Sequence, residues 1–180
     1  MISESQYWKE PLLDLAKQLK SLTAKPEMGD AELAQLERDV FIAFYSVRKL
    51  FETPFKTSDK TKKENLNLSW FKNIRTVTWL NNHKLAECYD LCQAHREIRS
   101  IPYVCGRIVH SHIFMPAFDD YNRLEGFFFN SDHDKDQRLY KISIHEVIRL
   151  FDMVGNDYPT SGSWAIDPES GEETFTSKRE

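Results

Sequence analysis

Residues 102–114 hold the densest group of side chains that could do chemistry. The segment reads PYVCGRIVHSHIF and places Cys105, Arg107, His110 and His112 among mostly apolar neighbours. Burying titratable groups among apolar side chains costs free energy, so each should have a hydrogen-bonding or charged partner or a functional role. A histidine can exchange a proton near neutral pH, and an arginine can stabilise a developing negative charge. Arg107, His110 and His112 are therefore candidate catalytic residues.

The spacing of Arg107 and His112 resembles the Arg-x4–6-His signature of HEPN-type domains. These domains are helical bundles that include many RNases of toxin and antiphage systems. The resemblance implies metal-independent RNA cleavage, in which the histidine takes the 2′-hydroxyl proton and the arginine binds the phosphate. On one helix, Arg107 and His110 would share a face, whereas Arg107 and His112 would lie about 140° apart. The alternative is a helix end whose histidines hydrogen-bond to backbone or carboxylate groups.

Three cysteines and a histidine form an incomplete set of zinc ligands. Cys88, Cys92 and His95 follow one another at spacings of four and three residues, with Cys105 downstream. Structural zinc sites usually pair such ligands at a turn and add a second pair, which the sequence does not supply. Cysteine is also a common buried apolar residue. We predict reduced, structural cysteines, no metal and no cofactor.

Three alternating aspartates imitate the start of a calcium-binding loop. Asp132, Asp134 and Asp136 have the spacing of its first three ligands. Such a loop needs glycine at its sixth position and glutamate at its twelfth, where this chain has Gln137 and Ser143. A solvated hairpin loop is the better prediction.

The stretch from residue 56 to residue 75 is basic and contains aromatic side chains. Lysine and arginine can contact phosphates, and bases can stack on an aromatic ring. The candidate nucleic-acid contacts are Lys62, Lys63, Trp70, Lys72 and Arg75. The alternative is a solvated, charged loop. The sequence has no Gly-rich phosphate loop, GxSxG elbow or HExxH helix.

Composition indicates one globular domain, expected over residues 1–158, with a polar tail over residues 159–180. Apolar residues make up 41% of the 180 residues, enough for a core. The net charge of −4 argues against a general electrostatic attraction to nucleic acid. We find no secretory signal, and no apolar run reaches the roughly 18 residues that span a bilayer. An odd cysteine count suits a reducing compartment, so we predict a cytoplasmic protein that does not contact membranes.

Helical periodicity is strongest in the first third of the chain. Residues 7–22 repeat leucines at spacings of three and four, and Pro11 either opens this helix or lies inside a longer one. A connector is expected over residues 23–29. Asp30 then looks like the N-cap of a long helix over residues 31–52, whose apolar stripe includes Phe44. Pro54 should end that helix.

Short elements are expected in the remaining two thirds. Their predicted ranges are a solvated loop at 56–65, one or two strands at 66–80, helices at 83–93 and 100–114, a hairpin of strands 123–129 and 138–143, and a helix at 144–155. The last helix begins with Ser143-Ile-His-Glu146, which matches a capping box.

These patterns predict an α+β fold: mainly a helical bundle with a late β-hairpin and a possible second short strand pair. For function, they favour a small non-catalytic binding or regulatory module that has a protein partner or self-associates. The alternative is the HEPN-like RNase, for which RNA is the partner. The position of Arg107 relative to the two histidines distinguishes these hypotheses best.

Overall fold

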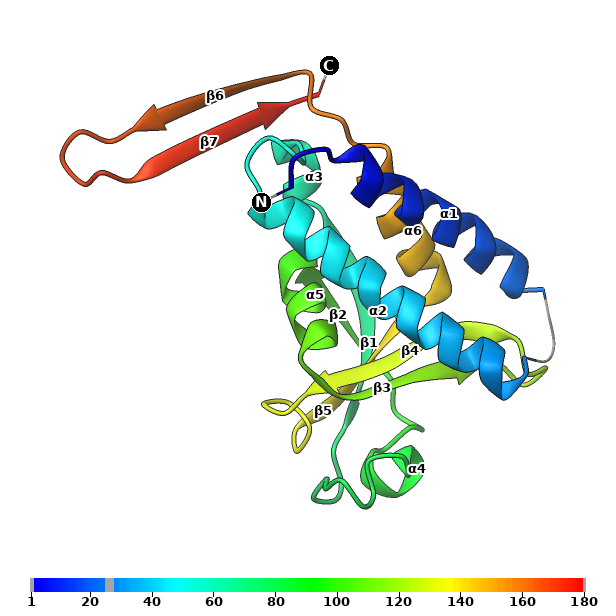
Figure 1. Ribbon diagram of the computed structural model, residues 1–180. Coiled ribbons are helices and arrows are strands. Elements are labelled where there is room, and N and C mark those ends of the chain that lie inside the picture. The colour runs from blue at the N-terminus through cyan, green and yellow to red at the C-terminus, as the bar shows by residue number, and fades with distance from the viewer. Residues whose placement is uncertain (1, 25–27, 180) are drawn as a thin grey trace.

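The fold is built on a five-stranded antiparallel sheet with the strand order β2-β1-β5-β4-β3. The computed structural model describes residues 2–24 and 28–179. The sheet strands are β1 Asn65–Lys72, β2 His95–Ser100, β3 Ser111–Phe118, β4 Leu124–Ser131 and β5 Arg138–Ser143. A separate two-stranded ribbon, β6 Ser161–Ile166 and β7 Glu173–Lys178, extends from the body (Figure 1). The α+β class is confirmed, but the prediction of mainly a helical bundle is wrong.

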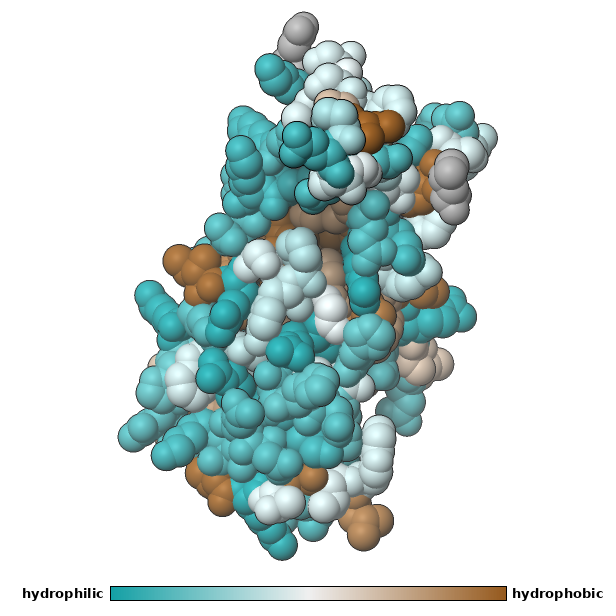
Figure 2. Space-filling model, turned by 90° about the vertical axis from the view of Figure 1, so that its left-hand side faces the viewer, coloured by the Kyte–Doolittle hydropathy of each residue, from teal (hydrophilic) through white to brown (hydrophobic). Residues whose placement is uncertain are grey.

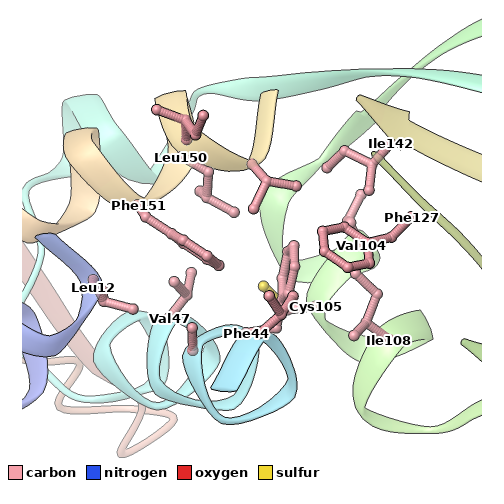
Figure 3. Close-up of a cluster of buried hydrophobic side chains, with 14 of the residues drawn as sticks. Leu12, Phe44, Val47, Val104, Cys105, Ile108, Phe127, Ile142, Leu150 and Phe151 are labelled. Atoms are coloured by element: carbon pink, nitrogen blue, oxygen red, sulfur yellow. The ribbon is translucent and has the colours of Figure 1, made fainter. Parts of the chain in front are cut away.

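Four longer helices cover one face of the sheet (Figure 1). They are α1 Gln6–Leu22, α2 Asp30–Glu52, α5 Ile101–Val109 and α6 Ile144–Gly155; α3 Asp59–Lys62 and α4 Leu85–Cys88 are single turns. Their apolar stripes meet the sheet in the main core, shown in Figure 3. There Phe44 of α2 packs edge-on against Phe151 of α6, with ring centres 5.3 Å apart. Burial of these stripes is the main stabilising contribution to the helical layer.

A second, smaller core lies on the other face of the sheet. It unites Phe71, Cys88, Tyr89, Ile113 and Leu139, together with neighbouring side chains of the segment around α4. Successive strand residues point to opposite faces, so β3 sends Ile113 into this core and Phe114 toward the main one. The sheet is therefore apolar on both sides where it is covered.

Several predicted elements are confirmed. The long helix runs from Asp30 to Glu52, with Gly29 rather than Asp30 at the N-cap. Strands β4 and β5 form the predicted hairpin, and Phe127 lies opposite Ile142. The Ser143 side chain caps α6 by accepting a hydrogen bond from the Glu146 amide.

Other predicted elements differ from those in the structure. The helix expected over residues 100–114 ends at Val109 and gives way to β3. The helix expected over residues 83–93 is reduced to α4, and the loop expected over residues 56–65 contains α3. Residues 159–180, expected to be a tail, contain the β6–β7 ribbon. The connector predicted at 23–29 includes residues 25–27, which lie outside the described residues.

Candidate functional site

A cleft of about 730 Å³ opens between the end of α2, α5 and the turn that follows β4. Figure 2 views the side on which α5 lies and shows a hollow with a hydrophobic floor between hydrophilic side chains. The apolar lining includes Phe51, Ile101, Pro102, Tyr103 and Cys105; the polar lining includes Arg48, Glu52, Lys62, Arg107, His110, Asp132 and His133. A largely apolar cavity of this size with a few convergent polar groups is typical of a ligand site.

Arg107 enters the cleft from α5 and is held by its neighbours. Its Nε lies 2.9 Å from Asp134 Oδ2, and its Nη1 donates to Ser131 Oγ at 2.9 Å. Ser131 Oγ in turn donates to Asp134 Oδ2 at 2.8 Å. The guanidinium also lies 4.8 Å from the centre of the Tyr103 ring, one helical turn earlier. A planar cation fixed in this way is suited to binding a carboxylate or phosphate oxygen.

His110 lines the same cleft at the C-cap of α5 and contacts an arginine of α2. Arg48 Nη1 lies 3.1 Å from His110 Nε2, and Arg48 Nε donates to Glu52 Oε1 at 2.7 Å. Arginine has donors and no acceptor, so Nε2 must accept this hydrogen bond through its lone pair. A neutral His110 then carries its hydrogen on Nδ1. His110 can accept a substrate proton at Nε2 only after Arg48 has moved away.

Cys105 reaches the cleft from the core side of α5. Its side chain is fully buried, and burial raises the pKa of its thiol far above the usual value. The thiolate is the nucleophilic form of cysteine, so this residue stays unreactive at neutral pH. Cys105 contributes apolar surface to the cleft wall.

His112 does not line the cleft. It lies on β3, where its side chain is 3% exposed and its ring stands 4.3 Å from that of Trp79. Its Nδ1 is 3.8 Å from an Asp132 carboxylate oxygen. Burial and, secondarily, the nearby Lys135 cation lower the pKa of His112. The structure thus brings Arg107 and His110 together and leaves His112 in a separate, buried position.

The predicted nucleic-acid contacts are dispersed. Lys62 lines the cleft, whereas Lys72 ends β1, the strand that begins just after Lys63. Trp70 is half-buried, and its ring stacks on that of His95 with centres 4.3 Å apart. Arg75 pairs with Glu87 at 3.2 Å. Helix α3, which ends at Lys62, and helix α4, whose Glu87 pairs with Arg75, lie at opposite ends of the molecule (Figure 1).

A network of arginines and tyrosines next to the cleft did not emerge from the sequence motifs. The guanidinium of Arg99, like that of Arg107, lies over Tyr103, and the Tyr103 and Tyr140 hydroxyls are 2.8 Å apart. Arg138 lies over Tyr140 with 6.0 Å to the ring centre. The signal that could have found part of it is the four-residue spacing of Tyr103 and Arg107, which places both on one face of α5; Arg99 comes from β2.

The cysteines and aspartates weighed as metal ligands take different positions. Cys88 belongs to the second core and Cys105 to the main one, while Cys92 is exposed. Each aspartate of the alternating triplet has a different charged or backbone partner: Lys135 for Asp132, Arg107 for Asp134 and the Val77 amide for Asp136. Among the described residues, no group of three or more such side chains could hold a metal ion.

Comparison with protein-family models, curated proteins and solved structures gave no match to this chain. Within residues 2–24 and 28–179, no helix has the length and apolar character needed to cross a membrane.

Proposed function

We propose that this protein is a non-catalytic binding module whose ligand occupies the cleft between α2 and α5. The ligand class is an anion joined to an apolar, preferably aromatic, body. The observation that carries this proposal is the combination of a mostly apolar lining with Arg48 and Arg107 at the same cleft. A cytoplasmic location and a protein partner belong to the same proposal.

The contacts within the cleft favour binding over chemistry. Arg107 is fixed by Asp134 and Ser131, so its guanidinium offers a preformed anion site. The Nε2 lone pair of His110 is occupied by Arg48, and the Cys105 thiol remains protonated. His110 and Cys105, the side chains that could start a reaction, are therefore not in a reactive state. The guanidinium groups of Arg48 and Arg107 retain further N–H donors for an anion.

The proposal is tested with 8-anilinonaphthalene-1-sulfonate, an aromatic sulfonate whose fluorescence reports binding to an apolar site. We expect saturable binding that is weakened by inorganic phosphate and by salt. Arg48→Gln should weaken binding about tenfold, because a hydrogen bond to a charged group is worth roughly 1.5–3 kcal/mol. Arg107→Gln should have at least the same effect.

The matched control is Arg38→Gln, which removes an arginine from the exposed side of the same helix; its side chain is 65% exposed. This variant should bind the probe like the wild type. Thermal unfolding of each variant separates loss of the site from loss of the fold, because Arg107→Gln leaves Asp134 without its cation. If Arg38→Gln and Arg48→Gln bind the probe with equal affinity, the probe does not bind in the cleft.

The second candidate function is the metal-independent RNase, favoured by the joint presence of Arg107 and His110 in one cleft. In this case Nε2 of His110 takes the 2′-hydroxyl proton once Arg48 is displaced. The 2′-oxygen then attacks phosphorus to form a 2′,3′-cyclic phosphate, the bond to the 5′-oxygen breaks, and this oxygen takes a proton from the solvent, while Arg107 stabilises the phosphate charge. RNA would enter past Lys62. The resemblance to HEPN-type domains remains a prediction from the Arg107–His112 spacing.

Incubating varied RNAs with EDTA distinguishes the two candidates. If the protein is an RNase, Arg107→Ala and His110→Ala should abolish cleavage while the fold is retained, and His112→Ala should mainly lower stability. Equal cleavage by the wild type and all three variants would indicate a contaminant. Absence of cleavage by the wild type would favour the binding module.

A further inference from the structure

Gly106 lies inside α5 at a position where the fold itself does not require a glycine. Its backbone is helical and open to any residue, since Gly171 is the described glycine with a positive φ. Beyond its chain neighbours and the backbone of its own helix, a Cβ at Gly106 would meet no heavy atom within 4 Å. Glycine in a helix interior destabilises the folded protein relative to alanine, because it loses more backbone entropy on folding. Local structure and packing therefore favour alanine here.

Other glycines of the chain show how a packing requirement differs from this case. A Cβ would overlap atoms of another residue at three positions: Gly126, Gly155 and Gly162. At Gly155, for example, it would lie 2.6 Å from a side-chain carbon of Leu13. The space next to Gly106 is open instead, and Gly106 lines the cleft. The open space is therefore part of the cleft.

Gly106 lies in the middle of the side of α5 that faces the cleft. Pro102 and Tyr103 lie about one helical turn before it and His110 about one turn after it, and all of them line the cleft. The helical rise separates Pro102 from His110 by about 12 Å along the axis. The missing side chain thus leaves a slot between these neighbours, and the backbone of α5 forms its floor.

The slot lies between the two arginines of the cleft. Arg107 follows Gly106 in the chain and is held on the side of the β4 turn by Asp134, whereas Arg48 enters from α2. Phe51 of α2 adds an aromatic ring to the same lining. A flat apolar body can approach a helix backbone closely at glycine, and it gains dispersion contacts there.

We propose that the aromatic ring of the ligand lies against the α5 backbone at Gly106, and that this position selects a planar ring over a bulky apolar body. This role of Gly106 rests on the proposed function of the cleft. The anionic group of the ligand binds the guanidinium of Arg107, the next residue of the chain. A methyl group at position 106 would occupy the space of the ring, and a bulky aliphatic body does not fit into a slot one side chain wide.

The variant Gly106→Ala separates the requirements of the fold from those of the ligand. Because alanine favours the helix, the thermal midpoint without ligand should rise by about 1–4 °C. The dissociation constant of 8-anilinonaphthalene-1-sulfonate should rise at least about tenfold, because the added methyl group displaces the ring. A variant that is more stable and binds more weakly has not lost its site through unfolding.

The matched control is Gly29→Ala. Gly29 is exposed at the N-cap of α2, and a Cβ there would likewise meet no heavy atom within 4 Å. This variant should bind the probe like the wild type.

Competition against the probe tests the preference for a planar ring. Naphthalene-1-sulfonate and camphor-10-sulfonate carry the same anion and the same number of carbon atoms, but only the first is planar. Naphthalene-1-sulfonate should displace the probe from the wild type at a concentration at least about tenfold lower. Gly106→Ala should reduce this difference.

The outcomes separate the role of Gly106 from the function of the cleft. If Arg48→Gln and Arg107→Gln weaken probe binding and Gly106→Ala does not, the cleft remains the binding site and the ring does not lie on Gly106. If the wild type does not bind the probe, both proposals are overturned. A lower thermal midpoint for Gly106→Ala would show that the fold requires this glycine, and equal displacement by the two sulfonates would show that the slot does not select a planar ring.

Discussion

Arg107 is presented to the cleft by three side chains from two parts of the chain. Asp134 comes from the turn after β4, Ser131 ends β4, and Tyr103 lies one turn earlier on α5. Because these contacts fix the rotamer before any ligand arrives, little side-chain entropy remains to be lost on binding. This fixed rotamer is why we propose Arg107 as the main contact for an anionic ligand in the cleft.

The buried His112 should make folding stability depend on pH. Burial lowers its pKa below the usual 6.5, so the folded protein resists its protonation. As the pH falls below about 6.5, the unfolded chain takes up a proton that the folded chain does not, and folding stability is lost. We expect this loss to be smaller in His112→Phe. Urea unfolding at several pH values between about 7.5 and 5 measures it.

His83→Ala is the control, because His83 lies exposed in the segment before α4. The stability of the His83→Ala variant should depend on pH in the same way as that of the wild type. If His112→Phe and the wild type lose the same free energy of unfolding over this range, the described environment of His112 is incorrect.

Part of the site could be predicted from the sequence, because Arg107 and His110 are near neighbours with reactive side chains. Their partners could not, since Arg48 and Ser131 come from distant segments that only the fold brings together. The spacing along the sequence also did not indicate which of the two histidines lies in the cleft with Arg107. The chain leaves the helix at His110 and turns into β3, so distances counted along a helix do not apply to His112.

Elements with one solvent-exposed face and one apolar face could be predicted from the sequence. The period of about 3.6 residues in α1, α2 and α6 and the flanking polar turns of the β4–β5 hairpin fix these elements locally. By contrast, β3 is apolar on both faces where it is covered and resembled the continuation of a helix. The edge strand β2 is largely polar, and the two ribbon strands carry only Trp164, Ile166 and Phe175 as large apolar side chains, so no sustained alternation marks them as strands.

The buried stripe of α2 gives a prediction at the scale of the element. Phe44 is fully buried and packs against Phe151, so Phe44→Ala leaves a cavity in the main core. We expect a loss of about 3–5 kcal/mol in the free energy of unfolding, measured by denaturant titration. Ile42→Ala on the same helix is the control, since Ile42 is 57% exposed and should cost much less. Similar costs for both would contradict the packing described for α2.

At the scale of the whole molecule, a buried polar junction joins segments far apart in sequence. Lys9 of α1 is fully buried and donates a hydrogen bond from Nζ to the Asp157 carbonyl oxygen. Asp157, just after α6, accepts hydrogen bonds at Oδ2 from the Ser58 amide at 2.7 Å and hydroxyl at 3.0 Å. The same loop region supplies Phe55 and Asp59 to the ribbon. The junction thus couples α1, α3 and α6 to the base of the C-terminal ribbon.

The final prediction tests this junction through its dependence on pH. Burial lowers the pKa of Lys9 from 10.5 to about 8, against the opposing effect of Asp157. Below about 8 both folded and unfolded chains hold the Lys9 proton; between about 8 and 10.5 the unfolded chain holds it more often. The stability of the wild type relative to Lys9→Met should therefore rise with pH across this window. Lys17→Met, whose side chain is 75% exposed, should stay parallel to the wild type. Denaturant unfolding at matched pH values measures both differences, and a Lys9→Met profile parallel to that of the wild type would show that Lys9 is not buried at this junction.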